Sequence, residues 1–301
     1  MSSSTRFVRV LTLVLSLWVA ACSHATPRTG AAGTTGSMAG ALRADARAAY
    51  EAGDFPRCAE LFARAKAVGR ERASDAYDAA CCTARAGDRD GAFARLEAAL
   101  DAGFRLADHL STDEDLSTLR RHSRWGAVLA RARAASDAYH RGENAELARL
   151  LTDDQRDRAA GPAGIDWSVV RQRDDERRAR VRQLLDGRAV RTAADFYAAA
   201  MVFQHGRTAD DFRTAHALAL KAVELDPTDD QARWLAAASK DRELMSEGQP
   251  QRYGTQFRKV DGKWHLYEVD PAVSDDERAQ WAVPPLAAAR RQAEAMNAQT
   301  R

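Results

Sequence analysis

Three features that would point to a specific class of protein are scarce in this sequence: net charge, cysteine and long apolar runs. Its 45 basic residues nearly balance its 43 acidic residues, which leaves a formal net charge of +2. Because nucleic-acid-binding proteins need a net basic face for the phosphates, this balance argues against a nucleic-acid partner. The apolar run at residues 10–20 is shorter than the about 20 residues that span a bilayer as a helix, so a permanent transmembrane anchor is not expected there.

Strong catalytic motifs are also missing. The chain has no G-x-S-x-G, no H-E-x-x-H and no phosphate-binding G-x-x-x-x-G-K-[ST] motif. Its seven histidines are scattered, and no pair among His205, His216 and His265 has a spacing typical of a metal site. We therefore predict no metal and no cofactor, and the sequence favours a protein that is not an enzyme.

The first 22 residues have the pattern of an export signal. Arg6 and Arg9 form a short basic region before the apolar run, and Val19-Ala20-Ala21-Cys22 is a small-residue cleavage site followed by a cysteine. This resembles a bacterial lipoprotein signal. The resemblance implies that residues 1–21 are removed and that acylated Cys22 holds the chain at a membrane surface. Removing residues 1–21 takes away two arginines and no acid, so the mature chain has a formal charge of 0.

The residues after Cys22 are predicted to form a tether. Residues 22–40 are mostly Ser, Thr, Gly, Ala and Pro, a composition that buries too little apolar surface to fold. Ser23 stands where an Asp would retain a lipoprotein at the inner membrane, and it resembles the arrangement sorted to the outer membrane. We expect the protein in the cell envelope, at the periplasmic face of the outer membrane.

Three cysteines remain if Cys22 is acylated. In an oxidising compartment an odd number leaves three thiols, or one disulfide and one thiol. Neighbouring Cys81 and Cys82 point to different sides of a helix, so the plausible disulfide joins Cys58 to one of them. The alternative is that no disulfide forms and that all three cysteines are simply small buried residues.

A spacing of 34 residues organises the first half. Gly53-Asp54 and Gly87-Asp88 are related by this offset, and it also relates two sets of helix-face positions. These sets are Cys58, Phe62 and Ala65, and Ala92, Leu96 and Ala99. The pattern resembles the tetratricopeptide repeat, which implies pairs of antiparallel helices over residues 41–140. Ser111 and Glu114 form a capping-box sequence, which predicts the start of a terminal helical cap.

Residues 141–301 are predicted to form a second helical domain with a small β-hairpin near residues 255–270, so the whole fold is mainly α. Asp261-Gly262 is a two-residue sequence favoured by type I′ hairpin turns. The acid–base pairs Asp154–Arg158 and Asp174–Arg178 have the i,i+4 spacing of solvated helix faces, and we interpret them in this way.

One acid lies on an apolar helix stripe. Trp234, Ala238, Asp241 and Met245 fall at i, i+4, i+7 and i+11, so Asp241 faces the core. A buried carboxylate is costly unless it is paired or hydrogen-bonded. Its candidate partners in the sequence are His205, Arg242, Tyr253 and Gln256.

Short motifs follow one another in the second half, including Gln204-His205-Gly206, Asp241-Arg242 and Tyr253-Gly254-Thr255-Gln256. Their succession resembles an uncharacterised bacterial domain family with Gln-His-Gly and Tyr-Gly-Thr-Gln signatures, over about Leu147 to Asn297. The resemblance implies no established activity.

Two functions fit these observations. The favoured one is a lipid-anchored envelope interaction or scaffold protein that binds a protein partner through packed helical repeats. The alternative is a hydrolase-like or small-ligand-binding site with His205 and Asp241 as candidate catalytic residues. Its candidate binding residues are Gln204, Arg242, Tyr253, Thr255 and Gln256. A purely structural network, in which these polar side chains satisfy one another, is the competing interpretation.

Overall fold

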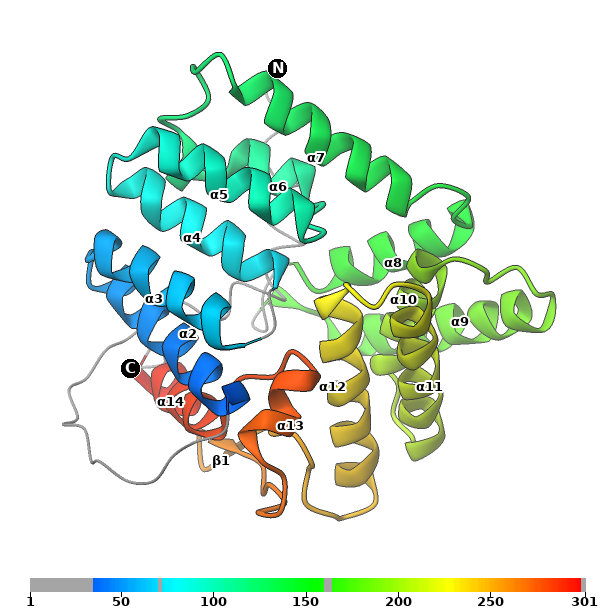
Figure 1. The fold of residues 1–301 in the computed structure, drawn as a ribbon. Coiled ribbons are helices and arrows are strands. Elements are labelled where there is room, and N and C mark those ends of the chain that lie inside the picture. Colours follow the sequence, from blue (N-terminus) through cyan, green and yellow to red (C-terminus); the bar gives the residue numbers. More distant parts are fainter. Residues whose placement is uncertain (1–34, 70–71, 160–163, 299–301) are drawn as a thin grey trace. The chain divides into compact units, whose positions relative to one another are not determined.

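The computed structural model describes residues 35–69, 72–159 and 164–298. These residues are mainly α-helical, with one small two-stranded antiparallel sheet, which confirms the predicted fold class (Figure 1). The predicted signal peptide at residues 1–21 and the lipidation site at Cys22 lie outside the described residues. Within the described part of the chain, no helix is both long enough and apolar enough to cross a membrane.

Contacts divide the chain into two compact units. The unit that we call the N-terminal unit contains residues 35–138, Phe257–Leu266 and the described residues from Pro271 on. The central unit contains Tyr139–Gln256 and Tyr267–Asp270. We expected residues 141–301 to form one domain. The structure instead groups the β-hairpin and the last two helices with the N-terminal unit.

This grouping has a physical reason in contacts between distant parts of the chain. Helix α13 (Asp275–Gln280) packs on α2 (Thr35–Glu51), and α14 (Leu286–Ala298) packs on strand β2 (Lys263–Leu266). At Gly40 of α2, an added Cβ atom would lie 2.6 Å from Pro285. Helix α2 includes residues 35–40, which we had assigned to the tether.

Two helical hairpins form the first part of the N-terminal unit (Figure 1). Helix α2 pairs with α3 (Phe55–Val68), and α4 (Ala73–Arg85) pairs with α5 (Arg89–Asp101). Gly53 and Gly87 adopt positive φ angles of 76° and 87°, a backbone conformation that favours glycine. Asp54 and Asp88 then cap the next helix by accepting a main-chain N–H bond. The 34-residue spacing thus produces the same turn twice.

The two sets of residues that are 34 positions apart both lie in the core. At most 2% of each residue's surface is exposed in both sets, Cys58, Phe62 and Ala65, and Ala92, Leu96 and Ala99. Small residues at these positions allow close helix packing.

Helices α6 (Ala107–Thr112) and α7 (Trp125–Tyr139) follow, with a 3₁₀ turn at Glu114–Leu116 between them. The capping box predicted from Ser111 and Glu114 is wrong. Ser111 is near the C-terminal end of α6, where its hydroxyl donates to the Asp108 carbonyl, and Asp113 caps the 3₁₀ turn instead.

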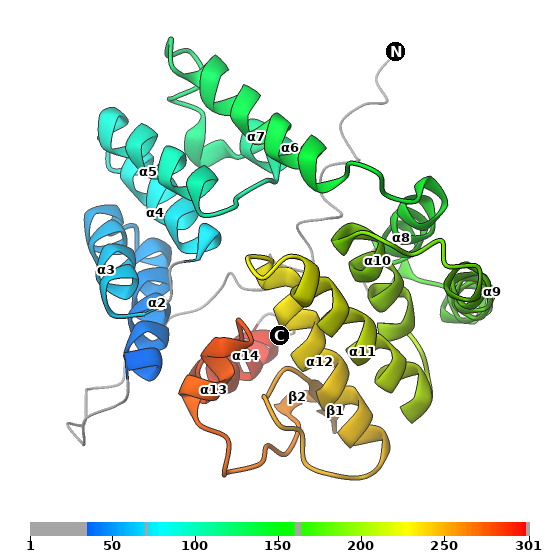
Figure 2. The same cartoon turned by 45° about the vertical axis from the view of Figure 1, so that its right-hand side comes forward.

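The described residues of the central unit include five α-helices, of which α10, α11 and α12 lie side by side (Figure 2). Their bounds are α8 (Ala145–Asp157), α9 (Trp167–Asp186), α10 (Ala193–Gln204), α11 (Ala209–Leu225) and α12 (Asp230–Ser246). Capping boxes at Thr192 with Asp195 and at Thr208 with Asp211 begin α10 and α11.

The predicted β-hairpin is confirmed. Strand β1 (Phe257–Val260) pairs with β2, and both turn residues, Asp261 and Gly262, have positive φ angles, as a type I′ turn requires. Asn297 of α14 accepts a hydrogen bond from the N–H of Trp264 and donates one to its carbonyl oxygen. These bonds fix the hairpin to the last helix.

Candidate functional sites

Asp241 lies on α12 and is completely buried. Its Oδ1 accepts hydrogen bonds from the N–H groups of Arg252 and Tyr253, both at 2.8 Å. Its Oδ2 accepts from the Thr255 N–H at 2.9 Å and from the Thr255 hydroxyl at 2.7 Å. Burial raises the pKa of Asp241, and the four hydrogen bonds offset only part of that effect. The carboxyl therefore fastens the loop at residues 252–255 to α12.

His205, at the end of α10, pairs with a different acid. Its Nδ1 lies 2.9 Å from Oδ1 of Asp154, which is fully buried in α8. Asp154 also accepts from the Gln155 amide at 2.8 Å and from Arg158 at 3.0 Å. Burial acts to raise the pKa of Asp154, but His205 and Arg158 outweigh it and hold the pKa below its usual value. No hydrogen bond of the described chain joins His205 to Asp241.

The pairing of His205 corrects one sequence interpretation. We interpreted the acids Asp154 and Asp174 as parts of solvated helix faces, but 0% and 5% of their surfaces are exposed. Arg158 connects them, with Nη1 on Asp154 and Nη2 2.5 Å from Oδ2 of Asp174. These acids face neighbouring helices, and the i,i+4 spacing alone does not reveal which face of a charged helix is covered.

Arg242 of α12 connects the loop that follows α12 to the C-terminal end of α10. Its Nε donates to Oε1 of Gln256 at 3.0 Å, and its Nη1 donates to the main-chain oxygen of Gln204 at 3.0 Å. The side-chain amide of Gln256 donates to the Thr255 hydroxyl, and this hydroxyl donates to Oδ2 of Asp241. Four of the five predicted binding residues are thus brought together by direct bonds. The fifth, Tyr253, contributes its main-chain N–H to Asp241.

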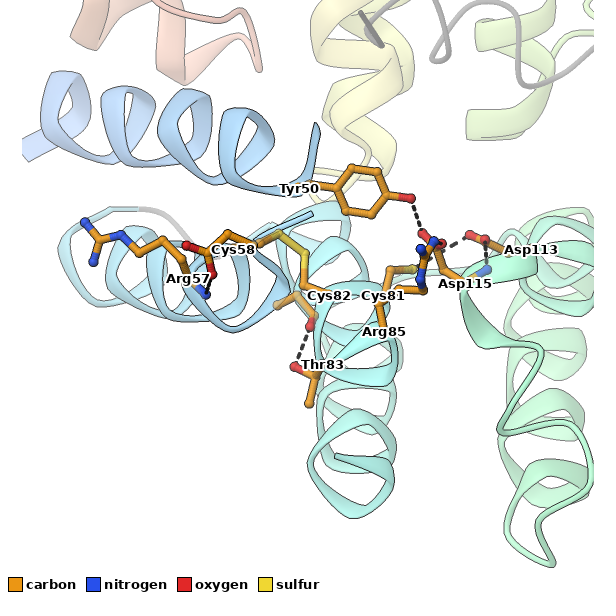
Figure 3. Close-up of a disulfide and its surroundings, with 11 residues drawn as sticks. Tyr50, Arg57, Cys58, Cys81, Cys82, Thr83, Arg85, Asp113 and Asp115 are labelled. Carbon is orange, nitrogen blue, oxygen red and sulfur yellow. Dashed lines mark hydrogen bonds and ion pairs between the residues drawn. A yellow bond between two sulfur atoms is a disulfide. The ribbon is translucent and has the colours of Figure 1, made fainter. Parts of the chain in front are cut away.

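The structure pairs Cys58 of α3 with Cys82 of α4 in a disulfide, with Cα atoms 5.9 Å apart, and leaves Cys81 as a buried free thiol (Figure 3). The bond joins the second helix of one hairpin to the first helix of the next. It therefore fixes the two hairpins of the N-terminal unit to each other.

Cys81 belongs to a polar cluster that sequence reasoning missed (Figure 3). The ligand-type atoms of Cys81, Asp113 and Asp115 lie within 4.8 Å of one another. Tyr77 donates to Asp113 at 2.7 Å, and Tyr50 donates to Asp115 at 2.6 Å. Burial raises the pKa of the Cys81 thiol well above its usual value. The thiol is therefore protonated at neutral pH, and hydrogen bonds within the cluster account for the arrangement.

The N-terminal unit also has a groove between α3, α4 and α5, with a volume of about 160 Å³. Its walls are mostly apolar: Phe62, Ala63, Ala76, Ala79, Ala94 and Ala98. Four charged residues complete the lining: Lys66, Arg72, Asp75 and Arg95. The only acid among them, Asp75, is buried against Arg43, whose Nε lies 2.6 Å from its carboxylate. The lining of the groove is therefore mostly apolar, with three basic residues and one acid.

Comparison with protein-family models, with curated proteins and with solved structures finds no match to this chain.

Proposed function

We propose that this protein is a lipid-anchored interaction protein of the bacterial cell envelope, and that its N-terminal unit binds a protein partner. In this proposal acylated Cys22 holds the chain at the periplasmic face of the outer membrane. The single observation that carries the binding part is the groove between α3, α4 and α5. The lipoprotein-like signal supports the location, and the tetratricopeptide-like hairpins support the mode of binding.

The groove is built to keep its shape. Its α3 and α4 walls are joined by the Cys58–Cys82 disulfide, and α4 and α5 form one hairpin. A binding surface that is rigid before the partner arrives loses less conformational entropy on association. Such a groove suits recognition of a short segment of another protein.

The lining defines the chemistry of that segment. A cavity of about 150 Å³ accommodates benzene, so a volume of about 160 Å³ accommodates one aromatic or leucine side chain. Arg95, a basic residue of the lining, favours acidic residues beside that apolar anchor. We therefore propose an acidic segment with one large apolar residue as the partner's binding element.

Site-specific cross-linking in intact envelopes tests this function. A photo-reactive amino acid at Ala63, which lines the groove, is expected to give a defined adduct with one protein. The same amino acid at Ala127, an exposed position on α7, is the control and is expected to give no such adduct.

Charge reversal at the groove sharpens the test. Arg95→Glu should abolish the Ala63 adduct, whereas Arg131→Glu, at a half-exposed arginine of α7, should leave it unchanged. An adduct that appears equally at Ala127, or that survives Arg95→Glu, contradicts the proposal.

The alternative, a hydrolase-like or ligand-binding site that uses His205 and Asp241, is not our proposal for the main function. Each of these two residues has its own set of partners in the network.

A further inference from the structure

The β-hairpin of the N-terminal unit has one partly buried face and one exposed face. In β2, Trp264 and Leu266 are partly buried, whereas Lys263 and His265 are exposed. Because successive side chains of a strand point to opposite faces of the sheet, this alternation separates the two faces. Helix α14 packs on β2, and Asn297 of this helix holds the main chain of Trp264. One face of the hairpin is thereby left to the solvent.

The strand register shows which residues of β1 share the exposed face. Arg258 lies opposite His265, and Val260 lies opposite Lys263. Residues directly opposite each other point to the same face of a sheet. All four of these residues are exposed, and 42% of the surface of Val260 is accessible. The exposed face therefore places an apolar side chain among basic ones.

The charge of the hairpin differs from that of the chain as a whole. Residues 257–266 contain three lysine or arginine residues and one acid, Asp261 of the turn, whereas the chain has 45 basic and 43 acidic residues. The third base, Lys259, is exposed beside the turn, with its Nζ 5.8 Å from the centre of the Trp264 ring. The side chain of Lys263 forms no ion pair within the described part of the chain.

We name this surface the hairpin patch; it consists of Arg258, Lys259, Val260, Lys263 and His265. Its positive charge is complementary to an anionic surface. Each lysine or arginine close to an anionic bilayer strengthens binding by about fivefold. An exposed apolar side chain among these bases fits the boundary between lipid headgroups and acyl chains, where binding combines apolar burial with electrostatic attraction.

We propose that the hairpin patch docks on a bilayer that contains anionic phospholipids. The basic side chains then lie at the lipid phosphates, and Val260 lies at the base of the headgroup layer. The patch is formed by β1 and β2, whereas the groove is formed by α3, α4 and α5. The inference agrees with the envelope location proposed above but does not rest on it, because the test below uses a chain without an acyl group.

The test measures binding of the full mature chain, with Cys22→Ser, to vesicles by sedimentation. We expect saturable binding to phosphatidylcholine vesicles with about 30% phosphatidylglycerol, at least about tenfold stronger than to phosphatidylcholine alone. Binding should weaken as salt is added, because salt screens the attraction between the bases and the lipid phosphates. Equal binding to both kinds of vesicle overturns the proposal.

Two double variants locate the surface. Lys259→Gln with Lys263→Gln is expected to weaken binding at least about tenfold, because it removes two bases of the hairpin patch. Arg57→Gln with Arg64→Gln is the matched control, since it removes the same charge from half-exposed positions of α3 in the same unit. The control should change binding less than about twofold. Equal losses in the two double variants overturn the proposal, because they show that only net charge matters.

A dye whose fluorescence depends on polarity tests the contact of the hairpin with the lipid. Attached to Val260→Cys, the dye should become brighter and shift to shorter wavelength when anionic vesicles are added. Attached to Ala127→Cys, at an exposed position of α7, it should not change. Cys81 is buried, so the added cysteine is the one that the dye labels. An unchanged signal at Val260→Cys overturns the proposal.

Two further outcomes with the wild-type hairpin contradict the proposal. Absence of binding to the anionic vesicles at about 1 mM lipid overturns it and leaves the lysines as protection of the strand edges against pairing with other chains. Binding to polyglutamate but not to the vesicles overturns it as well and identifies an acidic protein as the partner of the hairpin patch.

Discussion

Replacing Asp241 by alanine is expected to lower the free energy of unfolding of the central unit by about 3–5 kcal/mol. The change removes the acceptor for four hydrogen bonds, three of them from main-chain N–H groups at residues 252–255. Each buried donor left without an acceptor costs about 1–3 kcal/mol. The sum is reduced because the variant also removes a carboxyl whose burial is itself unfavourable, as its raised pKa shows.

The conservative variant Asp241→Asn tests the two carboxyl oxygens separately, because it keeps one oxygen and replaces the other by an NH₂ group. Its remaining oxygen still accepts from Arg252 and Tyr253, but its NH₂ group faces the N–H of Thr255. We expect about half of the loss, roughly 2 kcal/mol. Asp153→Ala is the matched control, because Asp153 is half-exposed on α8 and should change stability by less than about 0.5 kcal/mol.

Urea unfolding followed by circular dichroism measures the stability, and amide hydrogen exchange measures the loop. In Asp241→Ala the amides of Arg252, Tyr253 and Thr255 should lose protection before the rest of the unit. A stability within about 1 kcal/mol of the wild type, or unchanged protection of these three amides, would refute the role assigned to Asp241.

Further predictions concern the N-terminal unit. Cys58→Ser should lower stability by about 3 kcal/mol in urea unfolding, because the disulfide joins residues 24 positions apart, whereas Cys81→Ser should cost less than about 1 kcal/mol. Equal losses would contradict the pairing. Burial raises the pKa of Asp78 to about 7, with nearby acids adding to the effect and Arg47 opposing it. The folded state then binds more protons than the unfolded state between about pH 4 and 7, so stability falls as the pH rises through this range. Asp78→Asn should remove this fall and exceed the wild type at pH 8 by up to about 4 kcal/mol; an unchanged pH profile of unfolding would contradict this account.

Local patterns predicted the parts of the fold that depend on neighbours in sequence. The Gly-Asp turns at 53–54 and 87–88 and the hairpin turn at Asp261-Gly262 are set by the backbone preferences of their own residues. The apolar stripe of α12 likewise indicated that Asp241 is buried. The polar loop that satisfies Asp241 begins 11 residues later, close enough for its members to be candidates.

Contacts between distant segments could not be predicted in this way. Asp154 is 51 residues from His205 and looks like half of an exposed i,i+4 pair, since periodicity on a highly charged helix does not identify the covered face. The grouping of α13 with α2 joins opposite ends of the sequence. The cluster around Cys81 needs the loop at Asp113 to fold back on α4, which no local signal reveals.

Selection from a random peptide library on the full mature chain tests the central claim most directly. The account predicts enrichment of peptides with one large apolar residue flanked by acids, and loss of their binding in Arg95→Glu but not in Arg131→Glu. Enrichment of basic or uncharged peptides, or equal binding by the two variants, would contradict it.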